Sequence, residues 1–193
     1  MIYWISYYII KLIGQIFSPR TVLGKEHIPK QGGFILASNH KSNLDPFLIG
    51  LCFNRRISYM AKDSLFRNPI LGFYFRRVEA VPIRRGASDV RALRETLRRL
   101  KKGFPVVIFP QGTRESSGKK GKLHSGIGFL AVKGNVPVVP VHIDGSDKVL
   151  PPKARLPKRG RVTVSFGRPL SFSEEQPYEE IVTSIMKEIE DLS

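Results

Sequence analysis

Cysteine is nearly absent from this 193-residue chain, which contains only Cys52. A single thiol excludes an internal disulfide and any metal centre built from several thiolates. The composition is typical of a reducing compartment such as the cytosol. His27, His124 and His142 are scattered along the chain rather than spaced as metal ligands. We therefore expect no metal site.

Acidic residues are also scarce, with 16 Asp and Glu against 32 Lys and Arg and a net charge of +16. Seven of these acids lie in the last twenty residues, beside a single base, Lys187. Residues 1–173 therefore contain 31 bases and nine acids, a net charge of +22. A field of this strength favours a polyanionic partner, which is nucleic acid, anionic lipid or a phosphorylated substrate. Charge alone leaves these three open.

The first seventeen residues, MIYWISYYIIKLIGQIF, are mostly apolar but shorter than the roughly 20 residues that a spanning helix needs. They also lack the basic leader and small-residue cleavage site of a signal peptide. Tyr and Trp favour the headgroup level of a bilayer, where Lys11 can also place its charge. We expect residues 1–18 to form a membrane-anchoring helix that lies in the interface, followed by one domain over residues 19–193. The alternative is a helix buried against that domain.

Short apolar runs alternate with helical periods along the rest of the chain. The predicted strands are 33–38, 57–61, 80–83, 105–109, 136–143 and 162–166. The predicted helices are one that begins at Pro46, three that cover 66–75, 88–102 and 127–133, and one that forms the tail from Pro177. Asp45 is the expected cap of the first helix, and Ser88 is the expected cap of the helix 88–102. The alternation predicts an α/β sandwich, a single domain with a largely parallel mixed sheet between helices. Ligands of such sheets bind beyond the carboxyl ends of the strands, so residues after 33–38 and after 105–109 should share one cleft.

The first of these places holds NHKSNLDP, residues 39–46. A strand-to-helix turn can bring His40 and Asp45 together, so that the carboxylate orients an imidazole acting as a general base. No Ser or Cys nucleophile of the elbow type is nearby, so the base would act on a substrate hydroxyl. Spacing alone leaves equal room for an interpretation in which Asp45 only caps a helix and His40 is a loop residue.

The second place holds FPQGTRESSGKKGK, residues 109–122. Gly112 lets the backbone approach a ligand, and Arg114 can grip a phosphate with two hydrogen bonds. A Walker loop is excluded for two reasons. Gly112 and Gly118 are separated by one residue too many, and Lys120 stands where Ser or Thr should bind magnesium. Arg84 and Arg85 follow another short strand, and either could simply face solvent.

Four blocks, taken together and in order, resemble the glycerolipid acyltransferase family. NHKSNLDP resembles its N-H-x-x-x-x-D signature, VPIRR its block ending in a substrate-binding Arg, FPQGTR its F-P-E-G-T-R block and VPVVPV its last block. The resemblance covers roughly residues 20–145. It implies that residues 19–193 form an acyltransferase domain that needs no cofactor beyond its co-substrate. The acyl group would pass from acyl-CoA or acyl-carrier protein to 1-acylglycerol-3-phosphate, giving phosphatidic acid for phospholipid synthesis.

The resemblance also implies roles for individual residues. His40 would deprotonate the acceptor hydroxyl while Asp45 holds the imidazole. Five residues would bind the acceptor: Arg85, Gln111, Gly112, Thr113 and Arg114. The implied partners are an anionic membrane surface, a lysophospholipid and the acyl donor, at the cytoplasmic face of the cell membrane with peripheral or monotopic attachment.

Two positions depart from the family pattern. Gln111 replaces the acid of the third block, and Glu79 stands two residues before Val81, where the family often has Gly. Gln111 keeps open another acceptor on the same machinery, such as glycerol-3-phosphate or another lysolipid. A nucleic-acid-binding protein is the alternative from another class, suggested by the basic segment 88–102. That segment lacks interleaved aromatic residues for base stacking, and the apolar N-terminus has no use there, so we expect no nucleic-acid partner.

Overall fold

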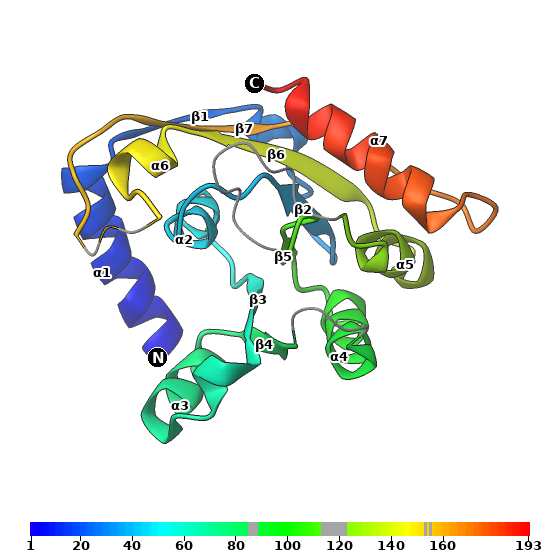
Figure 1. Cartoon of the computed structure of the whole chain (residues 1–193), viewed down its shortest axis with the longest axis horizontal. Coiled ribbons are helices and arrows are strands. Elements are labelled where there is room, and N and C mark those ends of the chain that lie inside the picture. The colour runs from blue at the N-terminus through cyan, green and yellow to red at the C-terminus, as the bar shows by residue number, and fades with distance from the viewer. Residues whose placement is uncertain (85–88, 113–122, 153, 155) are drawn as a thin grey trace.

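The computed structural model describes residues 1–84, 89–112, 123–152, 154 and 156–193. Within these residues seven strands form one sheet in the order β1-β7-β6-β2-β5-β3-β4 (Figure 1). The strands are β1 (Arg20–Leu23), β2 (Ile35–Ser38), β3 (Ser58–Lys62), β4 (Ala80–Ile83), β5 (Val106–Ile108), β6 (Val138–Asp144) and β7 (Val162–Phe166). Every neighbouring pair is parallel except β6 and β7, which are antiparallel. The prediction of a largely parallel, mixed sheet is confirmed.

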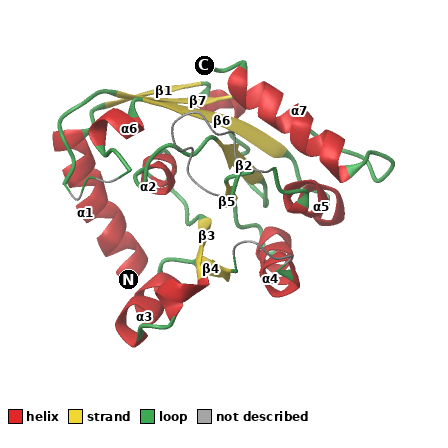
Figure 2. Cartoon of the chain, viewed as in Figure 1, coloured by secondary structure: helices red, strands yellow, loops and turns green. Residues whose placement is uncertain are grey.

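Helices cover both faces of the sheet (Figure 2). They are α1 (Ile2–Phe17), α2 (Asp45–Gly50), α3 (Pro69–Arg77), α4 (Val90–Lys101), α5 (Gly126–Gly134), α6 (Ser146–Val149) and α7 (Tyr178–Glu190), with 3₁₀ turns η1 (Lys25–His27) and η2 (Asp63–Phe66). Figure 1 places α1, α2, α3 and α6 on one side of the sheet and α4, α5 and α7 on the other. The result is a three-layer sandwich.

The strand β2 shows why the sheet has a core on each face. Phe34 and Leu36 pack into the core beneath α2, whereas Ile35 and Ala37 pack into the core beneath α4, α5 and α7. Successive side chains of a strand point to opposite faces, and both faces are covered here, so an uninterrupted apolar run is what the fold requires. None of these four residues is exposed to solvent.

Some short elements and one helix cap were not predicted. The four-residue elements β1 (RTVL) and α6 (SDKV) were not predicted, because neither contains the continuous apolar run that marks short strands such as β2 and β5. β1 pairs with β7, which is distant in sequence, so its extended form depends on a tertiary partner. The α4 helix is capped by Asp89, whose carboxylate accepts from the backbone N–H of Ala92 at 3.1 Å. The predicted cap, Ser88, lies outside the described residues.

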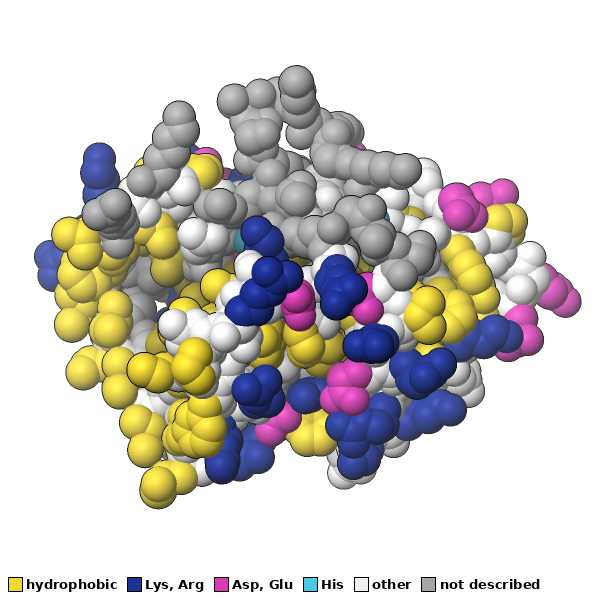
Figure 3. Space-filling model, turned by 60° about the horizontal axis from the view of Figure 1, so that its bottom comes forward, with side chains coloured by type: hydrophobic (Ala, Val, Ile, Leu, Met, Phe, Trp, Pro, Cys, Tyr) yellow, Lys and Arg dark blue, Asp and Glu magenta, His cyan; other side chains and the backbone are white. Residues whose placement is uncertain are grey.

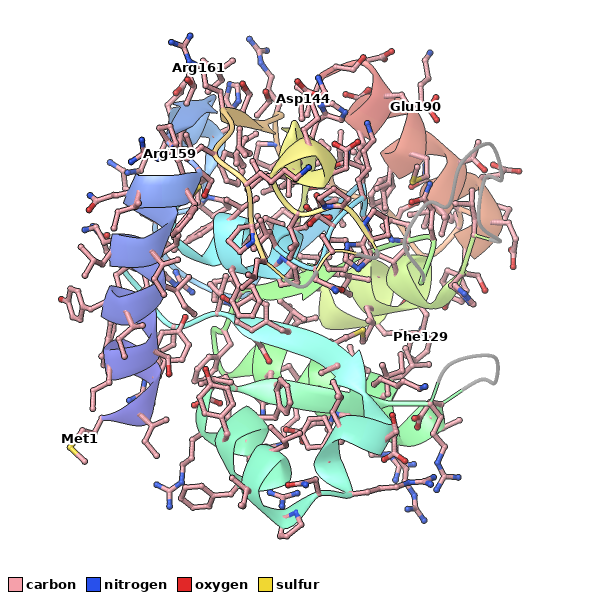
Figure 4. The ribbon with its side chains drawn as sticks, turned by 60° about the vertical axis from the view of Figure 1, so that its left-hand side comes forward. Met1, Phe129, Asp144, Arg159, Arg161 and Glu190 are labelled. Atoms are coloured by element: carbon pink, nitrogen blue, oxygen red, sulfur yellow. The ribbon has the colours of Figure 1, made fainter. Side chains whose placement is uncertain are left out.

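The N-terminal helix α1 packs against α2 and α3 with one side only. On that side Tyr3 is buried, and its hydroxyl accepts a hydrogen bond from the backbone N–H of Ile57 at 3.1 Å. The other side exposes six large apolar residues, which are Ile5, Tyr8, Ile9, Leu12, Ile13 and Ile16. Figure 4 shows this helix along one side of the molecule, with Met1 at its free end. No helix in the described part of the chain combines the length and apolar character needed to cross a membrane.

Candidate functional site

The turn after β2 places His40 at the carboxyl edge of the sheet. Asn39 fastens this turn to the neighbouring strand β6. Its side-chain NH₂ donates to the carbonyl oxygen of Ile143 at 2.9 Å, and its side-chain oxygen accepts from the backbone N–H of Ile143 at 2.8 Å. This amide pair continues the β2–β6 ladder with a side chain, so the backbone of the next residues is free to turn. His40 follows directly and is 7% exposed.

Asp45 holds the turn from its other end. It is fully buried, and its Oδ2 atom lies 2.8 Å from Nδ1 of His40. The same oxygen accepts hydrogen bonds from the backbone N–H groups of Lys41 and Ser42, each at 2.8 Å. Three donors on one oxygen fix the carboxylate in place. The distance brings together the two residues that the sequence predicted would pair.

The prediction that Asp45 caps α2 was wrong. Asp45 is the first residue of that helix, and the capping position is Leu44, which has no side-chain oxygen to accept from the helix. The physical reason is position, because the helix begins at Asp45 itself and the Oδ2 atom of Asp45 accepts from the preceding turn. The side chain of Asp45 therefore orders residues 40–42 rather than the helix start.

The tautomer of His40 follows from this geometry. A carboxylate can only accept, so Nδ1 carries the proton and donates to Asp45. In a neutral imidazole Nε2 is then left with a lone pair that can accept a proton from a substrate hydroxyl. The pair has the arrangement of a general base and its orienting carboxylate.

The third block meets the first through Phe109. The ring of Phe109 stacks on the imidazole of His40, with centroids 4.0 Å apart and planes inclined by 18°. Phe109 directly follows β5, which pairs with β2 in parallel, so both residues leave the sheet at the same edge. This contact shows that the two segments lie side by side, and the cleft that they were expected to share stays a prediction.

Beyond Phe109 the chain makes a tight turn. The backbone N–H of Gly112 donates to the carbonyl oxygen of Phe109 at 2.8 Å, and Gly112 has a φ of 65°. The left-handed conformation favours glycine, and a Cβ at this position would lie 2.8 Å from the imidazole of His124. Gln111 is 4% exposed. Gln111 and Gly112 therefore lie in the turn that directly follows Phe109, whose ring stacks on His40.

Three predicted site residues, Arg85, Thr113 and Arg114, lie outside the described residues. Their nearest preceding described residues are Arg84, after β4, and Gly112, after β5. Both segments follow parallel strands and so leave the sheet at the carboxyl edge. Their roles remain predictions from the resemblance.

Sequence reasoning assigned no role to Asn39 or Phe109, although both stand in the recognised blocks. The available signals were an Asn directly before His40 and an aromatic residue directly after a buried strand. Neither signal names the contact partner, because Ile143 is 104 positions away from Asn39. The hydrogen bonds and the ring contact become visible only in three dimensions.

An apolar pocket lies between α1, α2, α3 and β3. Its cavity volume is about 140 Å³. Pro46 and Phe47, which directly follow Asp45, form part of its wall. The rest includes Tyr3 and Tyr7 of α1, Tyr59 and Met60 of β3, and Tyr74 and Phe75 of α3. The pocket therefore shares the α2 helix with Asp45 and extends beneath the N-terminal helix.

An α/β sandwich with a His–carboxylate pair at the carboxyl edge of its sheet is the arrangement expected of an enzyme that activates a hydroxyl for group transfer. The family model described as Acyltransferase matches residues 19–144. The chain belongs to this acyltransferase family.

Individual relatives agree with this assignment. The chain is 31% identical to the 1-acyl-sn-glycerol-3-phosphate acyltransferase of Bacillus subtilis over 77% of its length and 72% of that protein. It is 30% identical to the chloroplastic 1-acyl-sn-glycerol-3-phosphate acyltransferase BAT2 of Brassica napus over 80% of its length, but spans only 46% of that relative.

A solved structure is also similar. The crystal structure of the 1-acyl-sn-glycerophosphate (LPA) acyltransferase PlsC from Thermotoga maritima superposes with a TM-score of 0.76 at 32% sequence identity. The match covers 96% of this chain and 79% of that one.

Proposed function

We propose that this protein transfers a fatty-acyl group from a thioester, acyl-CoA or acyl-carrier protein, to the free hydroxyl of 1-acylglycerol-3-phosphate, forming phosphatidic acid. The observation that carries the proposal is the 2.8 Å contact between Nδ1 of His40 and Asp45 in a chain of the acyltransferase family. Relatives named for this reaction match most of the chain.

His40 acts as the general base. Its Nε2 takes the proton from the acceptor hydroxyl as the hydroxyl oxygen attacks the thioester carbonyl carbon. The tetrahedral intermediate then collapses, the carbon–sulfur bond breaks, and the leaving thiolate takes the proton from the imidazolium. Asp45 stabilises the positive charge on His40 between these two proton transfers. No covalent acyl-enzyme forms, and no cofactor is needed beyond the thioester.

The acceptor phosphate binds beside this pair. Arg85 and Arg114 supply the charge, and the guanidinium fork of an arginine suits the oxygens of a phosphate. Gln111, Gly112 and Thr113 shape the site next to them. The turn at Gly112 and its connection to Phe109 support this placement, because Phe109 stacks on His40.

The apolar pocket accommodates an acyl chain. Its wall residues are almost all hydrophobic or aromatic, and two of them, Pro46 and Phe47, directly follow Asp45 in the chain. A fatty-acyl chain that enters here places its thioester carbonyl near His40. Burial of each methylene contributes about 0.8 kcal/mol, so every methylene that the pocket buries strengthens the binding of the chain.

The protein attaches to the cytoplasmic face of the membrane through the exposed side of α1, in a peripheral or monotopic manner. Ile70, Leu71 and Phe73 of α3 extend this apolar surface. Exposed Arg159 and Arg161 lie near the end of α1, where the backbone N–H of Gly160 donates to the carbonyl oxygen of Phe17 at 3.0 Å (Figure 4). Apolar contact together with nearby cations is the combination that favours an anionic bilayer surface.

One assay tests the reaction. Purified protein is incubated with labelled acyl-CoA or acyl-carrier protein and a panel of acceptors, and the products are separated by thin-layer chromatography. We expect labelled phosphatidic acid from lysophosphatidate. Product from glycerol-3-phosphate or another lysolipid, with none from lysophosphatidate, would show that Gln111 marks a different acceptor. Absence of product from every acceptor would contradict the proposed function.

A further inference from the structure

We propose that the exposed face of α4 is the docking site for an acidic acyl-carrier protein that delivers the acyl thioester. This face, called here the α4 basic face, consists of Arg91, Arg94, Arg98, Lys101 and Lys102, all exposed to solvent. Their spacing of three and four residues places them on one side of the helix. The inference rests on the proposed function, and it selects the carrier protein among the possible donors.

Only Arg98 of the α4 basic face forms an ion pair with an acid among the described residues. The carboxylate of Glu95 is held by Arg98 and Arg99, each at 2.8–2.9 Å. The strength of this pairing shows in the pKa of Glu95, which is lowered to about 2 chiefly by the hydrogen bond from Arg98.

Asp89 is also occupied, because its carboxylate accepts from the backbone N–H groups of Arg84 and Ala92. Four cations therefore have no ion pair with any described residue, namely Arg91, Arg94, Lys101 and Lys102. They repel one another, and a bound acidic partner would relieve that repulsion.

The position of α4 favours a protein over the membrane as this partner. The apolar surface proposed to meet the bilayer belongs to α1 and α3, on one side of the sheet, whereas α4 lies on the other side (Figure 1). Figure 3 views the edge between them, with hydrophobic side chains gathered toward the left and Lys and Arg side chains toward the lower centre and right. A bilayer held by α1 leaves the α4 basic face open to a soluble partner.

The extent of the face also suits a protein. Twelve helical residues span about 18 Å, and the basic residues run the whole length of α4. The phosphates of a CoA molecule form a compact group, which needs only a local cluster of cations. A row of cations along a helix instead matches an acidic surface of comparable length.

The helix is well placed to deliver a thioester to His40. It connects the carboxyl end of β4 to the start of β5, so its N-terminal end, with Arg91, lies at the sheet edge where His40 is found. The apolar pocket lies on the opposite side of the sheet, beneath α1 and α2. A carrier on α4 would pass its flexible arm over the edge to His40, while the acyl chain continues into the pocket.

The test compares two doubly substituted proteins of equal charge change. Arg91→Glu/Arg94→Glu reverses two cations of the α4 basic face, and Arg168→Glu/Lys187→Glu reverses two exposed cations elsewhere. Each protein is assayed with acyl-carrier protein and with acyl-CoA bearing the same acyl chain. We expect kcat/KM for the carrier to fall at least about tenfold in the α4 variant only, with less than about a threefold change for acyl-CoA.

Two further measurements separate the alternatives. Flotation with anionic vesicles should be the same for both double variants, and a selective loss in the α4 variant would show that this face binds the membrane. Binding of the carrier without an acyl group is measured by calorimetry, which needs no turnover. Binding lost only in the α4 variant would support the docking site even if the proposed reaction failed. No binding by the wild-type protein, or equal use of the carrier by both variants, would overturn it.

Discussion

The ring of Phe109 lies flat against the imidazole of His40, 4.0 Å away, and so joins two segments that are 69 positions apart. The stacked ring covers one face of the imidazole, while Asp45 fixes its Nδ1 edge. His40 is therefore restrained in both tilt and rotation, and Nε2 is the atom left to meet a substrate. Such preorganisation is what a general base requires.

Replacing His40 should abolish most of the activity without unfolding the protein. Removal of a general base typically lowers the rate about 10²- to 10⁴-fold, so we expect His40→Ala to lose at least about 100-fold in kcat. Asp45→Asn should lose less, because the imidazole remains. Steady-state kinetics and circular dichroism of both variants give the comparison. Near-normal turnover by a folded His40→Ala protein is incompatible with the mechanism.

Gln111 should have a smaller influence than Arg114. A Gln111→Glu change keeps the side-chain shape but adds a negative charge close to the acceptor site. We expect lysophosphatidate turnover to change by less than about tenfold, within roughly 1.4 kcal/mol. Arg114→Ala should lower it far more, chiefly through acceptor affinity, because a bidentate phosphate contact is lost. Kinetics at saturating acyl donor measure both effects. Strong new activity in Gln111→Glu, starting from little, would point to a different natural acceptor.

The exposed side of α1 should determine membrane binding. Ile9→Asn/Leu12→Asn places polar groups at positions that are 54% and 62% exposed, so the fold should tolerate the change. We expect weaker flotation with anionic vesicles, most clearly at high salt, where the basic surface is screened. Thr183→Asn/Ser184→Asn, on the exposed side of α7, is the matched control. Unchanged flotation of the α1 variant at high salt would refute the anchoring role.

Glu79 adopts a left-handed backbone conformation, with a φ of 64°, which explains why glycine suits this position. Its carboxylate compensates by pairing with Arg99 at 2.9 Å and Arg56 at 3.6 Å. We expect Glu79→Ala to be less stable than Glu79→Gly by about 1 kcal/mol, because both lose the ion pairs but only Ala retains the backbone strain. Urea unfolding measures the difference. The same pair of changes at Glu188, within α7, should give the opposite order.

The stability of the protein should depend on Glu95 in acid. Its pKa is lowered from 4.5 to about 2, first by Arg98 and then by Arg99, against the opposing effect of burial. A lowered pKa means that the ionised form is favoured in the folded state, so the stabilisation is present above pH 4.5 and is lost as the pH falls toward 2.

Glu95→Gln should therefore melt at a lower temperature than wild type at pH 7, and the gap should close as the pH approaches 2. The effect should be on the order of 1 kcal/mol or less, because the pair is partly exposed and screened by solvent. Thermal melts between pH 2.5 and 7 test this, with Glu175→Gln as the control for loss of a carboxylate elsewhere. A gap that persists unchanged to pH 2.5 would contradict the assignment.

The four blocks and the alternation of strands and helices were enough to predict the family, the layered α/β fold and the meeting of His40 with Asp45. These features are encoded locally, since a buried strand such as β2 needs a continuous apolar run and the turn after it spans only a few residues. The catalytic and acceptor-binding roles, including those of Arg85, Thr113 and Arg114, stay predictions.

Only the tertiary structure decided what Asp45 does with its carboxylate and which residues confine His40. Asp45 could cap a helix or order the turn, and both are equally compatible with its position in the sequence. The outcome depends on donors that the folded turn aims at one oxygen. In the same way Asn39 and Phe109 act through partners on β6 and beside β2, which are brought near by the order of strands in the sheet. Hydrogen bonds and ring contacts act over a few ångströms in space, so residues distant along the chain can satisfy them only after the sheet has formed.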